Sequence, residues 1–327
     1  MSKVSSTDGL GAYGIAARHK SPRRQSFLGG WGGLRQRRRH WAAGAVAAAA
    51  LAGCGSFRAP PAPAAVIPVA GPPHTLGLLP LYVGLACASG KTIVEWAPHA
   101  ALSLADHPTA PVTAFLLVRS DLVLLSPAAN PDFRWRDLRG VPLMSTDAPP
   151  PDLKLASTVL KEHEVPKAIG SMGLAQARRW FREGRLPYLL APLLPALALA
   201  AEDRGAVLAY VGAATAPVPR LLLVGRGPGL ERLLTALNAG LAYLASHSPA
   251  TVARLVHHDY PRVPPGLLAQ AIGTLDGLGA WPETSYPARG VYQNAEELLG
   301  SSAWPRYSAV VDPVPAQSAL GTSIAAP

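Results

Sequence analysis

Short apolar runs alternate with longer amphipathic stretches between residues 112 and 255, and this alternation limits the possible folds more than any other feature. The strand-like runs lie within 112–125, 207–212 and 220–224, and the helix-like stretches cover 153–163 and 230–246. A further helix is predicted to begin at Pro249, with Ser248 as its N-cap. Strands that alternate with helices predict an α/β fold with largely parallel sheets.

The N-terminal region has the layout of an export signal. A basic cluster, Arg37–Arg39, precedes an Ala-rich apolar run that ends in Leu-Ala-Gly-Cys at 51–54, and this order is typical of a secretory signal peptide. Because the small residues end on a cysteine, the segment resembles the lipobox of bacterial lipoproteins. The resemblance implies removal of residues 1–53 as a signal peptide and a diacylglycerol on the sulfur of Cys54, which leaves 274 of the 327 residues.

A single transmembrane anchor is the alternative interpretation of the same run. A membrane-spanning helix needs about 20 apolar residues, and the uncharged run from Trp41 to Phe57 is shorter and consists mostly of Ala and Gly. Small residues just before Cys54 also suit a processing peptidase. We therefore predict a lipoprotein signal, and the export route, Sec or twin-arginine, stays open.

The formal net charge of +10 belongs almost wholly to the N-terminal region. Residues 1–40 contain nine Lys or Arg and one acid, Asp8, so they carry +8 and the rest of the chain carries +2. Positive charge in a signal peptide holds its start on the cytoplasmic side of the membrane. The remaining charge therefore gives no indication of a nucleic-acid partner.

Composition divides the rest of the chain into three parts. Residues 54–74 are rich in Pro and Ala and predict an extended tether, residues 75–314 have enough apolar content for a folded domain, and residues 315–327 predict a flexible tail. The two cysteines form no disulfide if Cys54 is lipidated, so Cys87 is expected to be a buried thiol. Two cysteines are also too few for a zinc or iron–sulfur site built on cysteine.

A series of short motifs runs from about Leu79 to Asp312. The motifs are LPLYV at 79–83, NPDFRWRDLRG at 130–140, WFREG at 180–184 with Ala191–Pro192, YVG at 210–212 with Val218–Pro219, HSP at 247–249, DYP at 259–261, Ala280–Trp281, QNAEEL at 293–298 and VVD at 310–312. Their order and spacing resemble the nitrate/sulfonate/taurine-type substrate-binding proteins of ABC importers, a group that shares a fold with thiamine-pyrimidine synthases.

The resemblance implies a type II periplasmic-binding-protein fold, with two α/β lobes joined by two crossing strands and a hinge that closes on a ligand. Lobe I is expected at about 75–126 and 218–312, and lobe II at about 137–215. Such proteins carry no cofactor and catalyse no reaction. They capture a small-molecule solute outside the cytoplasm and deliver it to an ABC permease with its ATPase. Their helix N-termini point N–H groups into the cleft, which suits anionic groups.

The sequence departs from the family pattern at two points. Residues 83–90 run directly into 91–98, so about thirty residues, roughly one βα unit of lobe I, are missing after Tyr82. A proline-rich segment, 145–151, also replaces the family's Gly-rich ligand loop, and it has fewer free N–H donors. These departures leave open a degenerate member that acts as a sensor or a protein-interaction module without import.

The resemblance and the chain positions give a set of candidate ligand-binding residues. They are Tyr82, Trp96, His99, Arg119, Asp121, Ser145, Thr146, Asp147 and Thr215. Each has a structural alternative: Tyr82 as a core aromatic, His99 as a solvated or capping residue at the start of a helix near Trp96, and Arg119 with Asp121 as an ion pair. Turn and cap roles are the alternatives for the Ser145–Asp147 segment.

No catalytic or metal motif is apparent in the sequence. The run His257-His258-Asp259 is not a preformed ligand set, because adjacent residues on a helix point away from one another. Nucleophile elbows, phosphate loops and zinc-protease motifs are absent, as is the Cys-rich iron motif of a pyrimidine synthase. We therefore expect a non-enzymatic, metal-free lipoprotein that is anchored on the outer face of the cell membrane and binds a neutral or singly charged organic solute.

Overall fold

The computed structural model describes residues 69–70, 75–89, 99–103, 111–165, 168–203, 205–226, 229–299 and 305–321. The chain divides into two units, 1–52 and 53–327, and all of these residues belong to the second unit. Cys54, Trp96 and all of the predicted tether except Val69–Ala70 lie outside the described residues. The tether prediction is wrong for Val69 and Ala70, because they form a short strand that pairs with residues 99–100 of the folded domain. Within the described ranges, no helix is both long enough and apolar enough to cross a membrane.

The first sheet has four strands in the order β1-β2-β9-β3. They are β1 (Val69–Ala70), β2 (His99–Ser103), β9 (Leu221–Val224) and β3 (Val112–Leu117). β9 runs antiparallel to both of its neighbours, with Ala100 opposite Val224 in β2 and Phe115 opposite Leu222 in β3. β1 and β2 are parallel.

The second sheet has five strands in the order β6-β5-β7-β4-β8. They are β6 (Gly170–Ser171), β5 (Met144–Ser145), β7 (Leu189–Pro192), β4 (Leu122–Ser126) and β8 (Ala206–Tyr210). β5 is parallel to β6 and β7, whereas β4 is antiparallel to β7 and β8. Since β4 pairs entirely within this sheet, the first crossing lies at Arg119–Asp121, ahead of the boundary expected near residue 126.

The expectation of largely parallel sheets is wrong, because both sheets are mixed. β9 is antiparallel to its neighbours in the first sheet, and β4 is antiparallel to its neighbours in the second. Both strands adjoin the segments that cross between the sheets. β9 and β4 therefore run in the opposite direction to the strands on either side of them.

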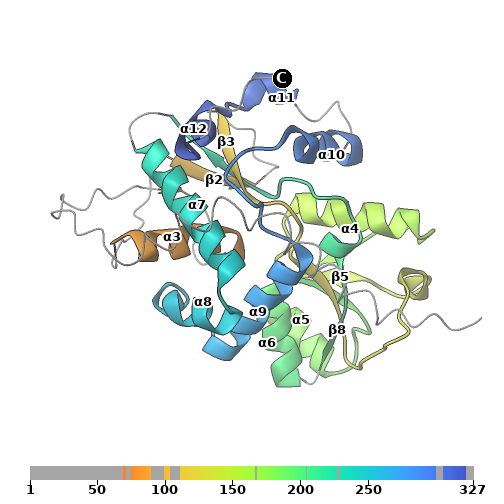
Figure 1. The fold of residues 1–327 in the computed structure, drawn as a ribbon. Coiled ribbons are helices and arrows are strands. Elements are labelled where there is room, and N and C mark those ends of the chain that lie inside the picture. Colours follow the sequence, from red (N-terminus) through yellow and green to blue (C-terminus); the bar gives the residue numbers. More distant parts are fainter. Residues whose placement is uncertain are drawn as a thin grey trace, which may run out of the picture. The chain divides into compact units, whose positions relative to one another are not determined.

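Helices cover both sheets (Figure 1). The longer ones are α3 (Leu79–Ser89), α4 (Pro150–Glu162), α5 (Leu174–Arg182), α6 (Leu193–Asp203), α7 (Leu230–Ser246), α8 (Pro249–Leu255), α9 (Pro265–Leu278) and α10 (Arg289–Leu299). The short ones are η2 (Leu76–Leu78), η3 (Trp135–Leu138), η4 (Val211–Ala213), η5 (His257–Asp259), α11 (Tyr307–Val310) and α12 (Val314–Ala319).

Local helix signals in the sequence are confirmed. α7 has the predicted bounds, and Ser248 caps α8 by accepting a hydrogen bond from the backbone N–H of Thr251. α3 packs along α7 through Gly84 and Gly240, where a Cβ would overlap the backbone carbonyl of Ala236 or Pro80. These two glycines are therefore required by the close approach of the helices.

The prediction of a flexible tail is wrong for its first residues. α12 covers Val314–Ala319, and Ala316 is fully buried against the core that contains α7. Asp312 holds the start of this segment to the first sheet, because its backbone N–H donates to the carbonyl of Val112 at 2.9 Å. A small residue at the contact point lets the helix pack closely without large apolar side chains.

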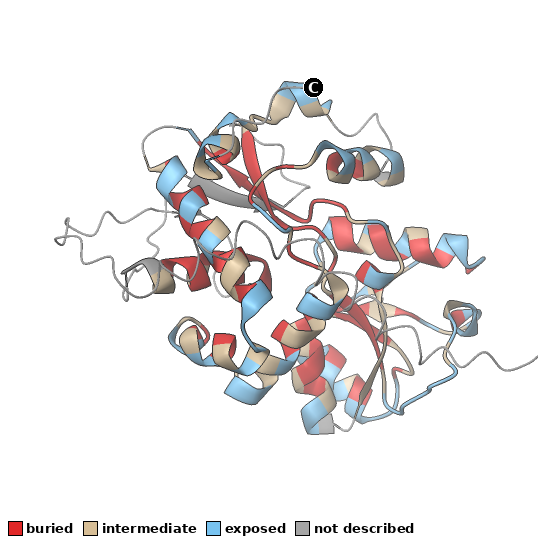
Figure 2. Cartoon of the chain, in the orientation of Figure 1, coloured by how far each residue is buried: buried red, intermediate tan, exposed pale blue. Residues whose placement is uncertain are grey.

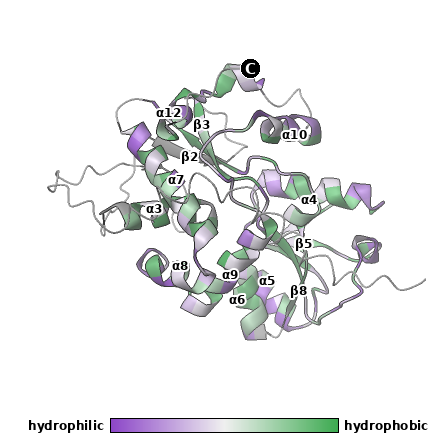
Figure 3. Ribbon diagram, in the orientation of Figure 1, coloured by the Kyte–Doolittle hydropathy of each residue, from purple (hydrophilic) through white to green (hydrophobic). Residues whose placement is uncertain are grey.

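The central strands are largely buried and hydrophobic (Figures 2 and 3). Alternate residues of these strands supply two separate hydrophobic clusters. In β4, Val123 and Leu125 belong to the cluster that includes α3, α6, α7 and α9, whereas Leu122 and Leu124 belong to the cluster that includes α4. Each fully buried Leu stabilises the fold by roughly 1.5–3 kcal/mol. Burial on both faces explains why these strands are continuous apolar runs in the sequence.

Candidate functional site

Two segments cross between the sheets and are hydrogen-bonded side by side. The backbone N–H of Val218 donates to the carbonyl of Val118 at 2.8 Å, and that of Arg220 donates to the carbonyl of Leu117 at 2.7 Å. The Nη1 of Arg119 adds bonds across the same junction, to the carbonyls of Gly212 at 2.6 Å and Thr215 at 2.7 Å. These bonds hold the two crossings together at one place.

A buried ion pair lies at this junction. Arg220 donates from Nε to Oδ1 of Asp152 at 2.9 Å, and its Nη2 lies 2.5 Å from Oδ2, so the contact is bidentate. The hydroxyl of Ser120 donates to the same Oδ1 and accepts from the backbone N–H of Leu122 at 3.1 Å. The side chains of Arg220 and Asp152 are 3% and 6% exposed. The pair therefore links both crossings to the first turn of α4.

Asp121 is a second carboxylate beside this pair. Burial is the main cause that raises the pKa of Asp121 to about 7, and the negative charge of Asp152 raises it further. The positive charge of Arg220 lowers the pKa of Asp121 in part, as do hydrogen bonds from backbone groups, including Leu193 at the start of α6. Asp121 is therefore a half-buried acid that titrates near neutral pH.

Some buried polar atoms have no hydrogen-bond partner among the described residues. They include Nη1 of Arg220 at the junction, and Oγ1 of Thr146 and Oγ1 of Thr75 elsewhere in the fold. Thr146 lies between β5 and α4, and its N–H donates to the carbonyl of Leu190 in β7 at 3.0 Å. Such atoms are uncommon in folded proteins, because burial without a partner costs about 1–3 kcal/mol each.

Thr75 precedes η2 and α3, and the start of this helical segment packs against the crossings. A Cβ on Gly77 would lie 2.8 Å from Cδ2 of Leu221 and 3.6 Å from Cβ of Leu117. The segment that contains Thr75 therefore approaches the residue next to Arg220. Three helical segments, beginning with α3, α4 and α6, meet the crossings at their N-terminal ends.

The predicted site residues of the second sheet have different surroundings. Ser145 is buried, and its hydroxyl donates to the carbonyl of Gly170 at 3.1 Å. Thr146 is fully buried, whereas Asp147 is exposed and has a left-handed backbone with φ of 51°. The hydroxyl of Thr215 donates to the carbonyl of Val211 at 3.4 Å. Of these four residues, Thr146 alone has a buried side-chain oxygen without a described partner.

Two predicted residues of the first lobe lie in regular structure. Tyr82 is half-buried on α3 and packs edge-on against Tyr260 with ring centroids 5.8 Å apart, so its core alternative describes its surroundings. The prediction that His99 lies at a helix N-terminus is wrong, because His99 begins β2 and is opposite Val69. Backbone pairing with β1 and β9 holds this segment extended.

The sequence analysis missed Ser120, Asp152 and Arg220. One signal was available: Arg220 is a single charge directly before the apolar run of β9, and a charge there needs a partner if it is buried. Asp152 follows three prolines, where an acid is expected to interact with the helix N-terminus, and nothing local relates it to a residue 68 positions away.

Two surface hollows lie away from the crossings. One of about 570 Å³ is lined by residues around Trp135 and His163, whose rings stack at 6.4 Å. The other, of about 410 Å³, is lined by residues 225–226 and 229–232 together with Asp312 and Pro315. Neither includes a residue of the buried polar cluster.

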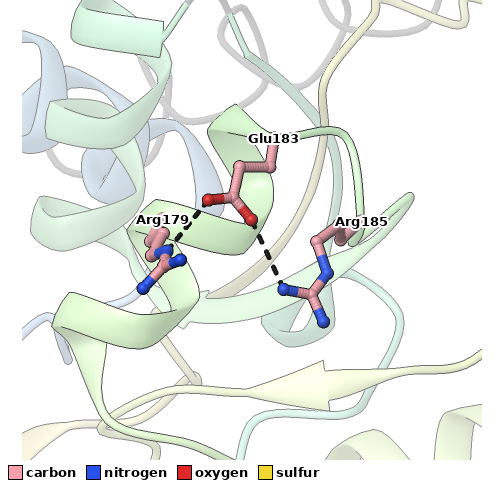
Figure 4. A network of polar contacts seen from close by, with 3 residues as sticks. All are labelled: Arg179, Glu183 and Arg185. Atoms are coloured by element: carbon pink, nitrogen blue, oxygen red, sulfur yellow. Dashed lines mark hydrogen bonds and ion pairs between the residues drawn. The ribbon is translucent and has the colours of Figure 1, made fainter.

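An exposed network on α5 is also separate from the junction (Figure 4). Glu183 accepts from Nε of Arg179 at 2.9 Å and from Nη1 of Arg185 at 3.4 Å. The hydrogen bond from Arg179 is the main cause that lowers the pKa of Glu183. Solvent screens these charges, so this network has little weight in stability or binding.

Comparisons with known proteins give structural neighbours only. No family model and no curated protein sequence matches the chain. The alkanesulfonate-binding protein SsuA from Xanthomonas axonopodis pv. citri bound to MOPS aligns with a TM-score of 0.53 and 15% identity over 79% of this chain and 99% of that one. The periplasmic aliphatic sulphonate binding protein SsuA from Escherichia coli gives 0.52 and 13%, over 76% and 91%.

A third neighbour is the ligand-binding component of an ABC-type import system from Staphylococcus aureus with zinc bound. It aligns with a TM-score of 0.53 and 13% identity over 74% of this chain and 94% of that one. The chain has the fold of ABC-importer binding proteins. The predicted two-lobed α/β fold is therefore confirmed, and the buried cluster lies where the two sheets are joined.

Proposed function

We propose that this chain captures a small solute outside the cytoplasm and delivers it to an ABC permease with its ATPase. The observation that carries this proposal is the buried polar cluster at the crossings, where Nη1 of Arg220 has no partner among the described residues. The buried hydroxyl of Thr146, between β5 and α4, has no described partner either. A ligand would satisfy such atoms, and the structural neighbours are binding components of importers. A binding role without catalysis fits both observations.

A thermal-shift screen of the purified full chain in detergent tests this function. The screen covers organic sulfonates, nitrate, pyrimidines, amides, amines and aromatic acids, and a captured solute should raise the midpoint of unfolding, since binding stabilises only the folded state. Stabilisation by none of them would contradict solute capture. That result would favour the alternative of a sensor or a protein-interaction module.

The variant Thr146→Val locates the bound solute. It removes one buried hydroxyl with little change of shape, so the stability of the free protein should change little while the ligand-induced shift falls by more than half. Thr158→Val is the matched control, because Thr158 is exposed on α4 and its hydroxyl donates to the carbonyl of Lys154. A shift that survives Thr146→Val undiminished would place the solute elsewhere.

We further propose that the mature protein is a lipoprotein anchored through Cys54. The Leu-Ala-Gly-Cys segment behind a basic and apolar region supports this, as does the Pro/Ala-rich stretch that follows as a tether. Mass spectrometry of the protein from membranes should find a diacylglycerol-modified Cys54 at the N-terminus. An intact N-terminus on a cytoplasmic protein would contradict the anchor and the location.

A further inference from the structure

One hydrophobic cluster continues from the first sheet into the second. Its fully buried members include Leu116 of β3 and Leu223 of β9 in the first sheet, and Val123 of β4 and Leu189 of β7 in the second. Separate domains each bury a core of their own, and few contacts cross the boundary between them. Here the core continues past the crossings, so the two sheets share one apolar interior.

On this face of the second sheet, α6 packs against α9 (Figure 1). α6 follows β7 of the second sheet, whereas α9 lies beyond the second crossing, after β9 of the first sheet. Leu197 of α6 and Ile272 of α9 are buried in the shared cluster. The side chains of Tyr210, at the end of β8, and Thr274, on α9, are also hydrogen-bonded. Apolar and polar contacts therefore bind α9 to the lobe of the second sheet.

The end of α9 is fixed to the lobe of the first sheet as well. The backbone N–H of Val118, directly after β3, donates to the carbonyl of Ala280 at 2.8 Å. The indole N–H of Trp281 donates to the carbonyl of Leu76 at 3.1 Å, at the start of the segment that leads into α3. α9 and the two residues after its C-cap are thus bonded to both lobes, and they form a strut between them.

A second strut lies on the opposite face of the second sheet. α10, which belongs to the part of the chain after the second crossing, packs against α4. Tyr292 of α10 shares the second hydrophobic cluster with Leu155 and Val159 of α4, and all three are buried. The side-chain amide of Asn294 donates from Nδ2 to the carbonyl of Pro217 at 2.8 Å, so α10 is also bonded to the second crossing.

The two struts oppose each other. They lie on opposite faces of the second sheet, because alternate residues of β4 enter the two clusters. A rotation about the crossings that compresses one contact therefore separates the other and exposes its apolar side chains to water, which is unfavourable. Relative motion of two lobes is the ordinary expectation, except where the interface between them is large and hydrophobic.

We infer that the two lobes of the free protein move as one rigid body, so that no opening of a hinge precedes solute capture. This inference goes beyond the proposed function, because it concerns the lobes and not the solute. The crossings then act as a fixed support between α9 and α10. A solute reaches the junction through movement of loops and side chains, while the two sheets keep their relative orientation.

Spin-label distances in the full chain without solute test the inference. Cys54→Ser and Cys87→Ser remove the native thiols, and pairs of cysteines are introduced at exposed positions: Thr235→Cys on α7, Lys161→Cys on α4 and Gln176→Cys on α5. The two pairs that include position 235 join the lobes, and the pair 161–176 lies within the lobe of the second sheet and is the control. We expect a single distance for each pair between the lobes, as narrow in distribution as that of the control pair.

The outcomes separate the two proposals. A second distance between the lobes, populated above about 10% while the control pair keeps one distance, would reveal an open state and overturn the inference. Broad distances in all three pairs would overturn it too, because the lobes themselves would not be rigid. Neither result bears on solute capture, which the thermal-shift screen decides. A screen without any stabilising solute would remove solute capture and leave the rigid lobes in place.

Discussion

Replacing Arg220 by methionine tests whether the ion pair holds the crossings to α4. The substitution keeps an unbranched side chain but leaves the carboxylate of Asp152 buried, with Ser120 as its remaining side-chain partner and the charge of Asp121 nearby. The pair is bidentate, at 2.9 and 2.5 Å, and its side chains are 3% and 6% exposed. The relevant cost is therefore that of a broken buried pair, about 3–5 kcal/mol.

Urea denaturation followed by circular dichroism measures this loss. With an m-value of about 1–3 kcal/mol/M, a loss of about 3–5 kcal/mol should lower the midpoint by roughly 1–5 M at pH 8. The loss should be smaller at pH 5, because Asp121, whose pKa is raised to about 7, is then protonated and its charge no longer repels the buried carboxylate. Arg179→Met is the control, since Arg179 is exposed on α5 and solvent screens its ion pair with Glu183.

A double substitution separates the ion pair from general packing. Asp152→Leu together with Arg220→Met removes both charges, so its loss should be smaller than the sum of the single losses by about 0.5–3 kcal/mol. Additive losses would refute the reasoning. A loss for Arg220→Met no larger than that for Arg179→Met would refute it too.

Three further predictions concern single positions. Because the pKa of Asp121 is raised to about 7, its ionisation destabilises the folded state as pH rises toward and through 7. Asp121→Asn should therefore raise the melting temperature at pH 8 and leave it unchanged at pH 4. The free energy of unfolding at pH 8 should increase by about 1–4 kcal/mol, after allowance for partial exposure of the side chain. Gly240→Ala should cost several kcal/mol in chemical denaturation, because its Cβ would overlap the carbonyl of Pro80. Gly266→Ala is the control and should be near neutral, because no atom lies within 4 Å of its Cβ. An equal loss in both variants would contradict the close packing of α3 and α7. Ser248→Ala should cost about 1 kcal/mol through loss of the cap on α8, and an unchanged midpoint would show that the cap contributes nothing.

Local patterns in the sequence were sufficient for part of the helices and strands. The bounds of α7, the cap at Ser248 and the buried face of α4 follow from residues within a few positions of one another, because helix periodicity and capping are short-range interactions. The apolar runs of β3, β4 and β9 were also apparent, since strands buried on both faces have little polar content.

The candidate site could be predicted only in part. Asp121 and Thr146 were among the residues predicted to bind a ligand, and that role stays a prediction. The structure places Asp121 in the first crossing and Thr146, fully buried, between β5 and α4. The family resemblance placed His99 at a helix start, whereas the structure pairs it with Val69 of β1, a partner that no local pattern indicates. Asp152 and Arg220 were missed because nothing near either residue reveals that the other is its partner.

The sequence by itself determined the sequence positions of the core segments and the location of the excess basic charge, because composition and short-range periodicity are properties of neighbouring residues. The tertiary structure alone decided the direction of the strands, the packing of α12 through Ala316, and the pairing of Asp152 with Arg220 beside Asp121. Those features depend on which distant segments share one low-dielectric interior. In such an interior, an ionisable group either pairs with an opposite charge or has a shifted pKa.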